Sequence, residues 1–358
     1  MKENMLTYIL EEKNVLNSII DNRYNNLNKY LNYISENKSD KWIVLATGSS
    51  ANAMQCAKYY VENIANVSVS FKLVSSFVHY EKNLDDDTFV FAVSQSGRSI
   101  STIEALKKAN NTHCFTLTSN EDSPINEISK EIINIGCGEE KVGYVTKGFS
   151  ATVLTFILIG LETAKRWHRI TELEYDKMLL ELRGIVNCVD YVISKTIDWY
   201  KINKNELIKY DKFIAIGYGP SVGVINEFDT KFTETLRVNI NAHELEEYMH
   251  GPYLALNDNE NIIFIETNNE LAKRQNILKS YIEKFNNNCY KISYRSDDFD
   301  KKTLNLDVDF SEFILPILTV IPIQYLAFQI AIDIKSDFLT DKFSDFASEM
   351  SSKTKKIF

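Results

Sequence analysis

Three serines stand close together in the sequence, at Ser94, Ser96 and Ser99. Serine hydroxyls are short neutral donors that can reach phosphate oxygens without filling a pocket. The residues before them, Phe89–Val93, predict a buried strand, and a helical pattern begins at Ile100. The first turn of a helix leaves backbone N–H groups free, and the helix dipole favours negative charge there. The spacing therefore predicts a phosphate-binding loop, the alternative being that the serines only cap the helix.

A second group of reactive side chains lies further along the chain. Glu227, Lys231 and Glu234 are four and three positions apart in a predicted helix at residues 222–237. This spacing puts the two carboxylates and the ammonium group on one helix face. Such a cluster can move protons, although an ion pair on a solvated face has the same spacing.

A histidine follows this helix in the sequence. His250 stands just before Gly251-Pro252, which predicts a helix end, and an imidazole that titrates near neutrality can transfer protons. The alternative is that His250 only complements the helix dipole. His243, Glu247 and His250 lack the HExxH spacing, so no metal site is predicted.

The elements that would position these groups alternate between strands and helices. Strands are predicted within Lys41–Ala53, Val67–Leu73 with Phe77, Phe89–Val93, His113–Thr118 and Glu131–Ile135. An apolar helix is predicted at Lys147–Trp167, and Thr171–Asn205 also has a helical pattern. This alternation predicts parallel βαβ units and a doubly wound α/β sheet.

The second half of the chain repeats this plan. Lys212–Val224 lines up with Lys41–Ala53, so that Gly219 matches Gly48. Further strands are predicted at Ile262–Ile265, Cys289–Ser293 and Leu306–Phe310. The uncharged stretch Phe313–Ile332 is long enough to span a membrane, but its match to the first apolar helix predicts a buried core helix instead.

Length and composition fit a two-lobed globular protein. The chain has 358 residues, of which 44% are hydrophobic, and a net charge of −9, which argues against nucleic-acid binding. The five cysteines are scattered, and the first residues are polar, so we expect no signal peptide and a reduced, cytoplasmic protein. The expected division is a helical arm (1–40), a first lobe (41–170), a helical bridge (171–205), a second lobe (206–340) and a tail (341–358).

Several motifs together resemble one family. They are TGSS at Thr47–Ser50, SQSG with Ser99 at Ser94–Ser99, GEEKVGYVTKGFS at Gly138–Ser150, and EFDTKFTETL with EEYMHGP within Glu227–Pro252. The chain resembles the double sugar-isomerase (SIS) family, namely the isomerase half of glucosamine-6-phosphate synthase and the deglycases of fructosamine 6-phosphates. The resemblance implies two tandem SIS lobes, each a mainly parallel five-stranded sheet between helix layers (αβα).

The resemblance also implies roles for individual residues. The sugar-phosphate pocket falls on Ser50, Ser94, Gln95, Ser96 and Ser99. Glu234 falls on the proton-shuttling carboxylate, and Lys231 on the helix lysine. His250 falls on the ring-opening histidine, which the neighbouring subunit contributes in relatives, so a homodimer or dimer of dimers is expected. Lys353 lies where the Schiff-base lysine would lie, although a frayed basic tail would look the same.

The sequence departs from the synthase in three places. It contains no glutaminase half, it has Val145 where a serine is expected, and its tail lacks the DxPRxLAKS pattern. We therefore expect a deglycase that turns an amino-linked ketose 6-phosphate into a hexose 6-phosphate and an amine, without metal or organic cofactor. The alternatives are a glucosamine-6-phosphate deaminase, an aldose–ketose isomerase, or a non-catalytic regulatory protein that binds sugar phosphates.

Overall fold

The computed structural model describes residues 3–109, 112–129, 131–295, 300–340 and 342–354. The chain divides into two compact units. We call the unit of residues 14–180 and 341–358 lobe 1, and the unit of residues 1–13 and 181–340 lobe 2. The five-part division expected from the sequence remains a prediction.

Lobe 1 contains a fully parallel sheet of five strands. The strands are β1 Lys41–Leu45, β2 Ser68–Lys72, β3 Phe89–Val93, β4 His113–Thr118 and β5 Glu131–Asn134, in the order β2-β1-β3-β4-β5. Every residue of β3 is buried, which explains why this strand is an uninterrupted apolar run.

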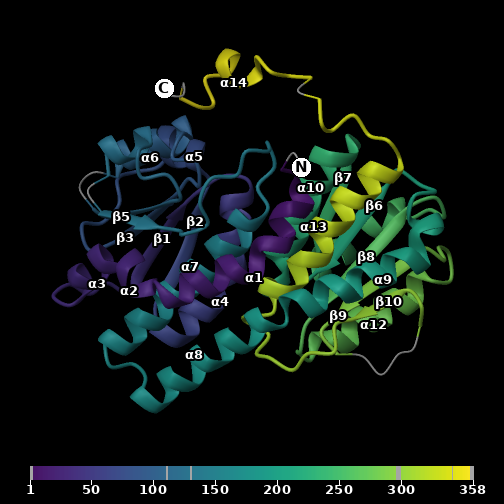
Figure 1. Ribbon diagram of the computed structural model, residues 1–358, viewed down its shortest axis with the longest axis horizontal. Helices are drawn as coiled ribbons and strands as arrows, with labels where there is room; N and C mark the ends of the chain where they lie inside the picture. The colour runs from purple at the N-terminus through teal and green to yellow at the C-terminus, as the bar shows by residue number, and fades with distance from the viewer. Residues whose placement is uncertain (1–2, 110–111, 130, 296–299, 341, 355–358) are drawn as a thin grey trace. The chain divides into compact units, whose positions relative to one another are not determined.

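Helices cover both faces of this sheet (Figure 1). The helices of this part of the chain are α1 Met5–Asp21, α2 Arg23–Asn26, α3 Asn28–Ile34, α4 Ser49–Ala65, α5 Val74–Tyr80, α6 Ile100–Lys108, α7 Lys147–Arg166, α8 Glu172–Asn187 and α14 Phe346–Glu349, with a short 3-10 helix η1 at Pro124–Glu127. Helices α5 and α6 pack together on one face, and α4 and α7 on the other. Aromatic rings fill the space between the sheet and the layer of α4 and α7, where the Trp42 and Phe91 ring centroids lie 4.7 Å apart.

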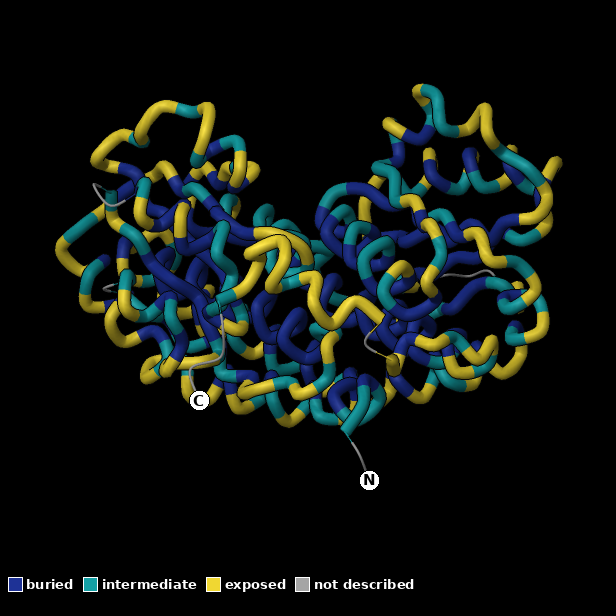
Figure 2. The backbone as a smooth tube through the Cα atoms, turned by 90° about the horizontal axis from the view of Figure 1, so that it is seen from above, coloured by how far each residue is buried: buried dark blue, intermediate teal, exposed yellow. Residues whose placement is uncertain are grey.

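Lobe 2 has the same plan, with a fully parallel sheet. Its strands are β6 Phe213–Gly217, β7 Ile240–Glu244, β8 Asn261–Glu266, β9 Cys289–Ser293 and β10 Thr303–Asn305, in the order β10-β9-β8-β6-β7. Its helices are α9 Val189–Leu207, α10 Ser221–Leu236, α11 Leu245–Met249, α12 Leu271–Ile282 and α13 Pro316–Asp333, with η2 at Pro252–Ala255. In each lobe the middle strand of the sheet, β3 or β8, is buried along its whole length, and the exposed parts of the chain lie toward the outside (Figure 2).

The internal repeat predicted from the sequence is confirmed by this topology. Strand β6 takes the place of β1, and β8 takes the place of β3. Gly48 and Gly219 follow the matched strands with similar left-handed backbones, at φ +56° and +54°. The fold class, two five-stranded αβα lobes, is therefore correct.

Two local predictions were wrong, and one strand was missed. Phe77 lies in α5 rather than in a strand, because Val74, Phe77 and Val78 have helical spacing. Strand β7 was not predicted, since it is an edge strand in which only Ile240 is buried. The last strand is β10, and 306–310 is not a strand, because the left-handed backbone of Asp307 (φ +55°) interrupts the extended chain.

The two long apolar helices are core helices of their own lobes. Both are long and apolar enough to cross a membrane, but the apolar stretch of α7 is wholly buried and 83% of that of α13 is buried. Helix α7 packs on α4, where a Cβ added at Gly160 would lie 2.9 Å from Val61 Cγ2. Helix α13 packs on α10, and Thr235 Oγ1 donates to the Ala327 carbonyl at 3.0 Å. This packing supports the interpretation of Phe313–Ile332 as a buried helix.

Candidate functional site

The predicted phosphate loop lies at the topological switch point of lobe 1. Strands β1 and β3 are parallel neighbours, with Leu45 opposite Ala92, and the sheet continues outward from them in opposite directions. In such sheets the ligand crevice lies beyond the carboxyl ends of the two strands where the order reverses. The loop at 94–99 follows β3 there, and Ser50 in the first turn of α4 follows β1. The fold thus brings the predicted phosphate residues to one edge.

Internal hydrogen bonds shape the loop at 94–99. The buried Ser94 hydroxyl accepts from the Ser99 N–H at 3.4 Å, and the Ser94 carbonyl accepts from the Gly97 N–H at 2.9 Å. Ser99 caps α6, because its Oγ accepts from the Thr102 N–H at 3.4 Å. Ser96 is exposed. Ser94 and Ser99 therefore hold the turn as well as offering hydroxyl groups.

The N–H groups that the loop offers to an anion differ in part from those predicted. The Ser99 N–H already donates to the Ser94 hydroxyl, and the Ile100 N–H donates to the Ser352 carbonyl at 3.2 Å. The first turn of α6 therefore has fewer free N–H groups than expected. Among the described residues, no hydrogen bond uses the N–H groups of Gln95, Ser96 and Arg98. Successive N–H groups in a tight turn form an anion-binding concavity, so these three are the better candidates.

Gly97 allows this turn for two reasons. Its backbone is left-handed (φ +65°), and a Cβ there would overlap Ser123 Oγ. We expect Gly97→Ala to displace the loop and weaken glucose 6-phosphate binding by more than about tenfold, measured by calorimetry. Gly219→Ala is the matched control, because Gly219 has the same left-handed backbone with nothing within 4 Å of its added Cβ. Equal binding by the Gly97→Ala variant and the unchanged protein would contradict this role of the loop.

The C-terminal tail lies beside the phosphate loop. Lys353 forms an antiparallel bridge with Ser99, and the Thr354 N–H donates to the Arg98 carbonyl at 2.9 Å. The Arg98 guanidinium in turn donates to the Thr354 carbonyl through Nε at 3.0 Å. The structure therefore brings Lys353 to the lobe 1 loop.

The reactive cluster on α10 belongs to lobe 2. Lys231 and Glu227 are fully buried, and the Lys231 ammonium lies 2.5 Å from Glu234 Oε2 and 3.6 Å from Glu227 Oε1. The Glu234 side chain keeps 36% of its surface exposed. The cluster is a buried ion pair with one carboxylate open on one side, rather than a solvated charged face. Glu227 was noted in the sequence only for its spacing, and its burial could not be foreseen from it.

His250 ends α11 and is exposed. Its Nδ1 lies 2.7 Å from the Glu246 carbonyl, and because a carbonyl only accepts, Nδ1 carries the proton. In the neutral ring, Nε2 is then free to accept a proton. Within the described part of the chain, no hydrogen bond or ion pair joins His250 to Glu234.

Of the other residues considered for a metal, His243 is half-buried and Glu247 is exposed. Burial lowers the pKa of His243, which favours the neutral ring. Within the described ranges, no group of three or more His, Cys, Asp or Glu side chains is placed to hold a metal ion.

The matching edge of lobe 2 is filled by its own side chains. The Tyr218 hydroxyl donates to the Thr267 carbonyl at 3.0 Å and accepts from the Thr267 N–H at 3.2 Å, so it bridges the loops after β6 and β8. Burial raises the pKa of Tyr218 to about 12, so this hydroxyl keeps its proton. Glu312 accepts from Thr267 Oγ1 and Asn269 Nδ2 at 3.2 and 2.9 Å. A bridging ring and a carboxylate disfavour an anion here, whereas lobe 1 has the exposed Thr47 in place of Tyr218.

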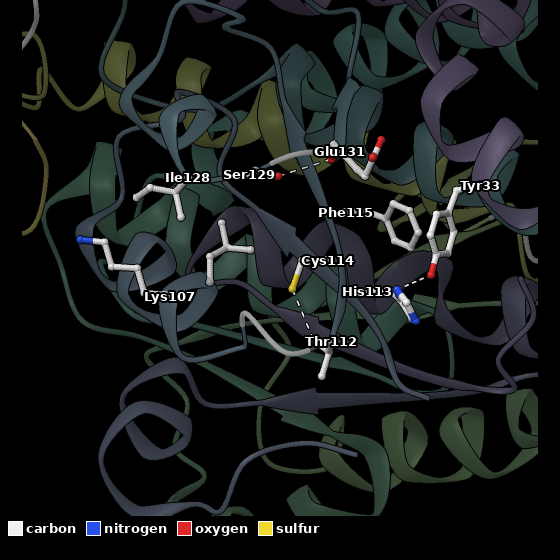
Figure 3. A pocket seen from close by; sticks show the side chains of 10 residues that line it. Tyr33, Lys107, Thr112, His113, Cys114, Phe115, Ile128, Ser129 and Glu131 are labelled. Carbon is white, nitrogen blue, oxygen red and sulfur yellow. Dashed lines mark hydrogen bonds between the residues drawn. The ribbon is translucent and has the colours of Figure 1, made fainter. Parts of the chain in front are cut away.

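A cavity of about 580 Å³ lies at the opposite edge of the lobe 1 sheet. Its lining includes Tyr33 of α3, Cys114 and His113 at the start of β4, and Glu131 at the start of β5, and the Tyr33 hydroxyl contacts His113 Nδ1 (Figure 3). These are the amino ends of the strands, away from the edge where ligands bind in such sheets. We assign no ligand to this cavity.

Part of the chain matches a known domain family, and the whole chain resembles proteins of known name. Residues 37–161 match the SIS domain. A curated relative, the isomerizing glutamine–fructose-6-phosphate aminotransferase of Bacteroides thetaiotaomicron, is 24% identical over 323 residues, which cover 89% of this chain and 51% of the relative. The chain spans about half the length of the curated relatives it matches.

Two solved structures share the whole fold. A candidate phosphosugar isomerase of Clostridium difficile 630 superposes with a TM-score of 0.91 and 25% identity, covering 98% of this chain and 99% of that one. The C-terminal domain of glucosamine-fructose-6-phosphate aminotransferase from Francisella tularensis superposes with a TM-score of 0.83 and 22% identity, covering 94% and 98%. The family resemblance predicted from the motifs is confirmed.

Proposed function

We propose, on the premise that this chain carries a SIS domain and has the two-lobed fold of its relatives, that it is an enzyme acting on an amino-linked ketose 6-phosphate. In the proposed reaction, an Amadori product 6-phosphate and water give a hexose 6-phosphate and a free amine. The observation that carries the proposal is the buried cluster of Glu227, Lys231 and Glu234. A protein that only bound sugar phosphates would not need this cluster, whose desolvation costs free energy.

The phosphate group is assigned to the lobe 1 loops. Its proposed partners are the hydroxyl groups of Ser50, Ser94, Ser96 and Ser99 and the backbone N–H groups of Gln95, Ser96 and Arg98. These donors are neutral, so the attraction comes from aligned N–H and O–H dipoles and from the ends of α4 and α6. Binding the distant phosphate lets its free energy orient the reacting carbons.

The proton transfers are assigned to Glu234 and His250. His250 Nε2 accepts the proton of the anomeric hydroxyl and returns it to the ring oxygen as the ring opens. Glu234 takes a proton from C1 and returns it to C2, while the C2 oxygen gains a proton and the amine nitrogen loses one, which converts the aminoketose into the imine of an aldose. Water then adds to C1, the amine leaves with a proton, and the hexose 6-phosphate remains. The Lys231 ammonium, 2.5 Å from Glu234, supplies a positive charge near the developing enolate.

A second copy of the chain is proposed next to His250. Tyr253 and Leu254 follow it with 40% and 77% of their surface exposed. Exposed apolar side chains beside a reactive histidine fit a contact between subunits, in a homodimer or a dimer of dimers. The proposed location is the cytoplasm, where the five cysteines, none of which forms a disulfide, would stay reduced.

The test is a panel of fructosamine 6-phosphates, glucosamine 6-phosphate and fructose 6-phosphate, with amine release and hexose phosphate followed together. Amine release from a fructosamine 6-phosphate is the expected result. Turnover of glucosamine 6-phosphate alone would replace the deglycase with a deaminase, and interconversion of fructose 6-phosphate alone would replace it with an isomerase. Binding without any turnover would favour the regulatory protein.

Lys353 is proposed to form a reversible imine with the carbonyl of open-chain fructose 6-phosphate, releasing water, and a second water molecule hydrolyses this imine to restore the carbonyl and the lysine. We expect sodium borohydride to trap a covalent adduct with fructose 6-phosphate in the unchanged protein and not in Lys353→Arg, as measured by mass spectrometry. Lys342→Arg, in the same tail, serves as the control and should still be trapped. Equal trapping in Lys353→Arg would show that the tail lysine has no covalent role.

A further inference from the structure

Glu140 joins the phosphate loop to the start of α7. Its Oε2 lies 2.7 Å from Gln95 Nε2, and its Oε1 accepts from the Thr146 N–H at 2.9 Å. Its Oε2 also accepts from the Gly148 N–H at 3.3 Å. Thr146 is the N-cap of α7, which has no side-chain cap of its own, so Glu140 supplies the acceptor from a distance. Burial raises the pKa of Glu140, and the hydrogen bonds from Gln95, Thr146 and Gly148 oppose that rise.

The chemistry of Glu140 fixes the orientation of the Gln95 amide. An ionised carboxylate can only accept hydrogen bonds, so the NH₂ group of Gln95 must face it. The same Nε2 lies 3.7 Å from Cys137 Sγ. Gln95 Oε1 has no hydrogen bond among the described residues and is not among the buried side-chain atoms that lack a partner. The group that this side chain leaves for a ligand is therefore a carbonyl oxygen.

Gly148 lets the helix approach this pair closely. A Cβ added there would overlap Gln95 Nε2 and lie 2.7 Å from Glu140 Oε2. Glycine in a helix normally costs stability relative to alanine, so this glycine is explained by the space that Gln95 and Glu140 need. The packing of α7 thus locks the amide in place as well as the carboxylate does.

Lobe 2 has a carboxylate in the same position, but the loop that it holds is closed. Glu312, shortly before α13, accepts from Thr267 and Asn269 in the loop after β8, just as Glu140, before α7, accepts from Gln95 in the loop after β3. In lobe 2 the held loop is closed by Tyr218. In lobe 1 the loop after β3 stays open, so the Gln95 side chain can contact a ligand.

We infer that Glu140 is a positioning residue that presents the carbonyl oxygen of Gln95 to a hydroxyl or ammonium group of the bound sugar phosphate. The inference rests on the proposed function and assigns Gln95 two separate tasks. Its backbone N–H faces the phosphate, whereas its side chain selects the sugar. The phosphate group is mainly a hydrogen-bond acceptor and a carbonyl oxygen can only accept, so we expect the side chain to add little to phosphate binding.

The first test compares inorganic phosphate with glucose 6-phosphate by calorimetry. In Gln95→Ala we expect the affinity for inorganic phosphate to stay within about twofold and that for glucose 6-phosphate to fall about tenfold, the effect of one lost hydrogen bond. Equal weakening of both ligands would overturn the inference, because the side chain would then be a phosphate donor. No weakening of either would overturn it as well.

The second test is a double-mutant cycle with Glu140→Gln. The amide introduced there has one acceptor oxygen in place of two for the donors of Gln95, Thr146 and Gly148, so it holds the Gln95 amide less firmly, and glucose 6-phosphate should bind about tenfold more weakly while inorganic phosphate does not. In the Gln95→Ala background the same substitution should change glucose 6-phosphate affinity less than twofold. Additive effects would overturn the inference, since Glu140 would then act on folding alone.

Two further comparisons keep the outcomes separate. If Glu140→Gln does not fold, Gln95→Met, which keeps the side-chain length without hydrogen bonds, must still reproduce the loss for glucose 6-phosphate alone. If the unchanged protein binds neither probe, the proposed sugar-phosphate site fails, and the inference fails with it. If it binds both and the variants show no selectivity, only the inference fails.

Discussion

The Glu234→Gln variant is expected to lose turnover by about 100- to 10,000-fold, the range typical of a missing acid–base group. An amide cannot accept the proton from C1 at working pH, but its carbonyl can still accept a hydrogen bond from Lys231, which lies 2.5 Å from Glu234 Oε2. Binding of glucose 6-phosphate should therefore stay within about twofold. Initial rates of amine release, together with calorimetric binding, measure the two effects separately.

Asp229→Asn is the matched control on the same helix. Asp229 is half-buried on α10, outside the cluster of Lys231 and the two glutamates, and burial raises its pKa, so losing its charge should cost little. We expect its turnover to stay within a few-fold of the unchanged protein. Turnover that survives in Glu234→Gln would place the proton transfer on another residue, and turnover lost equally in both variants would indicate general damage to α10.

The Lys231→Met variant is expected to unfold more easily by about 3–5 kcal/mol. Methionine fills most of the space of the lysine, but it leaves the buried Glu227 carboxylate without the ammonium 3.6 Å away. A loss of this size lowers the melting temperature of a unit of this length by about 10 °C. Thermal unfolding followed by circular dichroism measures it.

Adding Glu227→Gln to Lys231→Met should recover a large part of this loss, because no uncompensated charge then stays buried. The exposed Lys273→Met on α12 is the control, with an expected change within about 0.5 kcal/mol. If the double variant is no more stable than Lys231→Met, the loss of stability does not come from the broken ion pair. The packing of the lysine side chain is then the better explanation for that loss.

The sequence by itself determined the elements and their chemistry. The buried run Phe89–Val93, the serine turn and the helix start at Ile100 are all found as predicted, because local hydrophobic pattern and capping decide them. The repeat of 41–53 at 212–224 predicted two lobes of one topology, and the motifs predicted the family. Strand β7 was missed because an edge strand with one buried residue has no clear apolar pattern.

Only the tertiary structure decided which of these groups meet. Lys353 reaches Ser99 because a tail far away in sequence pairs with the loop, and Arg98 and Thr354 are separated by 256 positions. Gln95 faces Glu140 because α7 begins at that sheet edge, with Gly148 leaving room for both. Such contacts depend on the order of strands in the sheet and on the space between the layers. The pattern of apolar and polar residues in the sequence predicts neither of these.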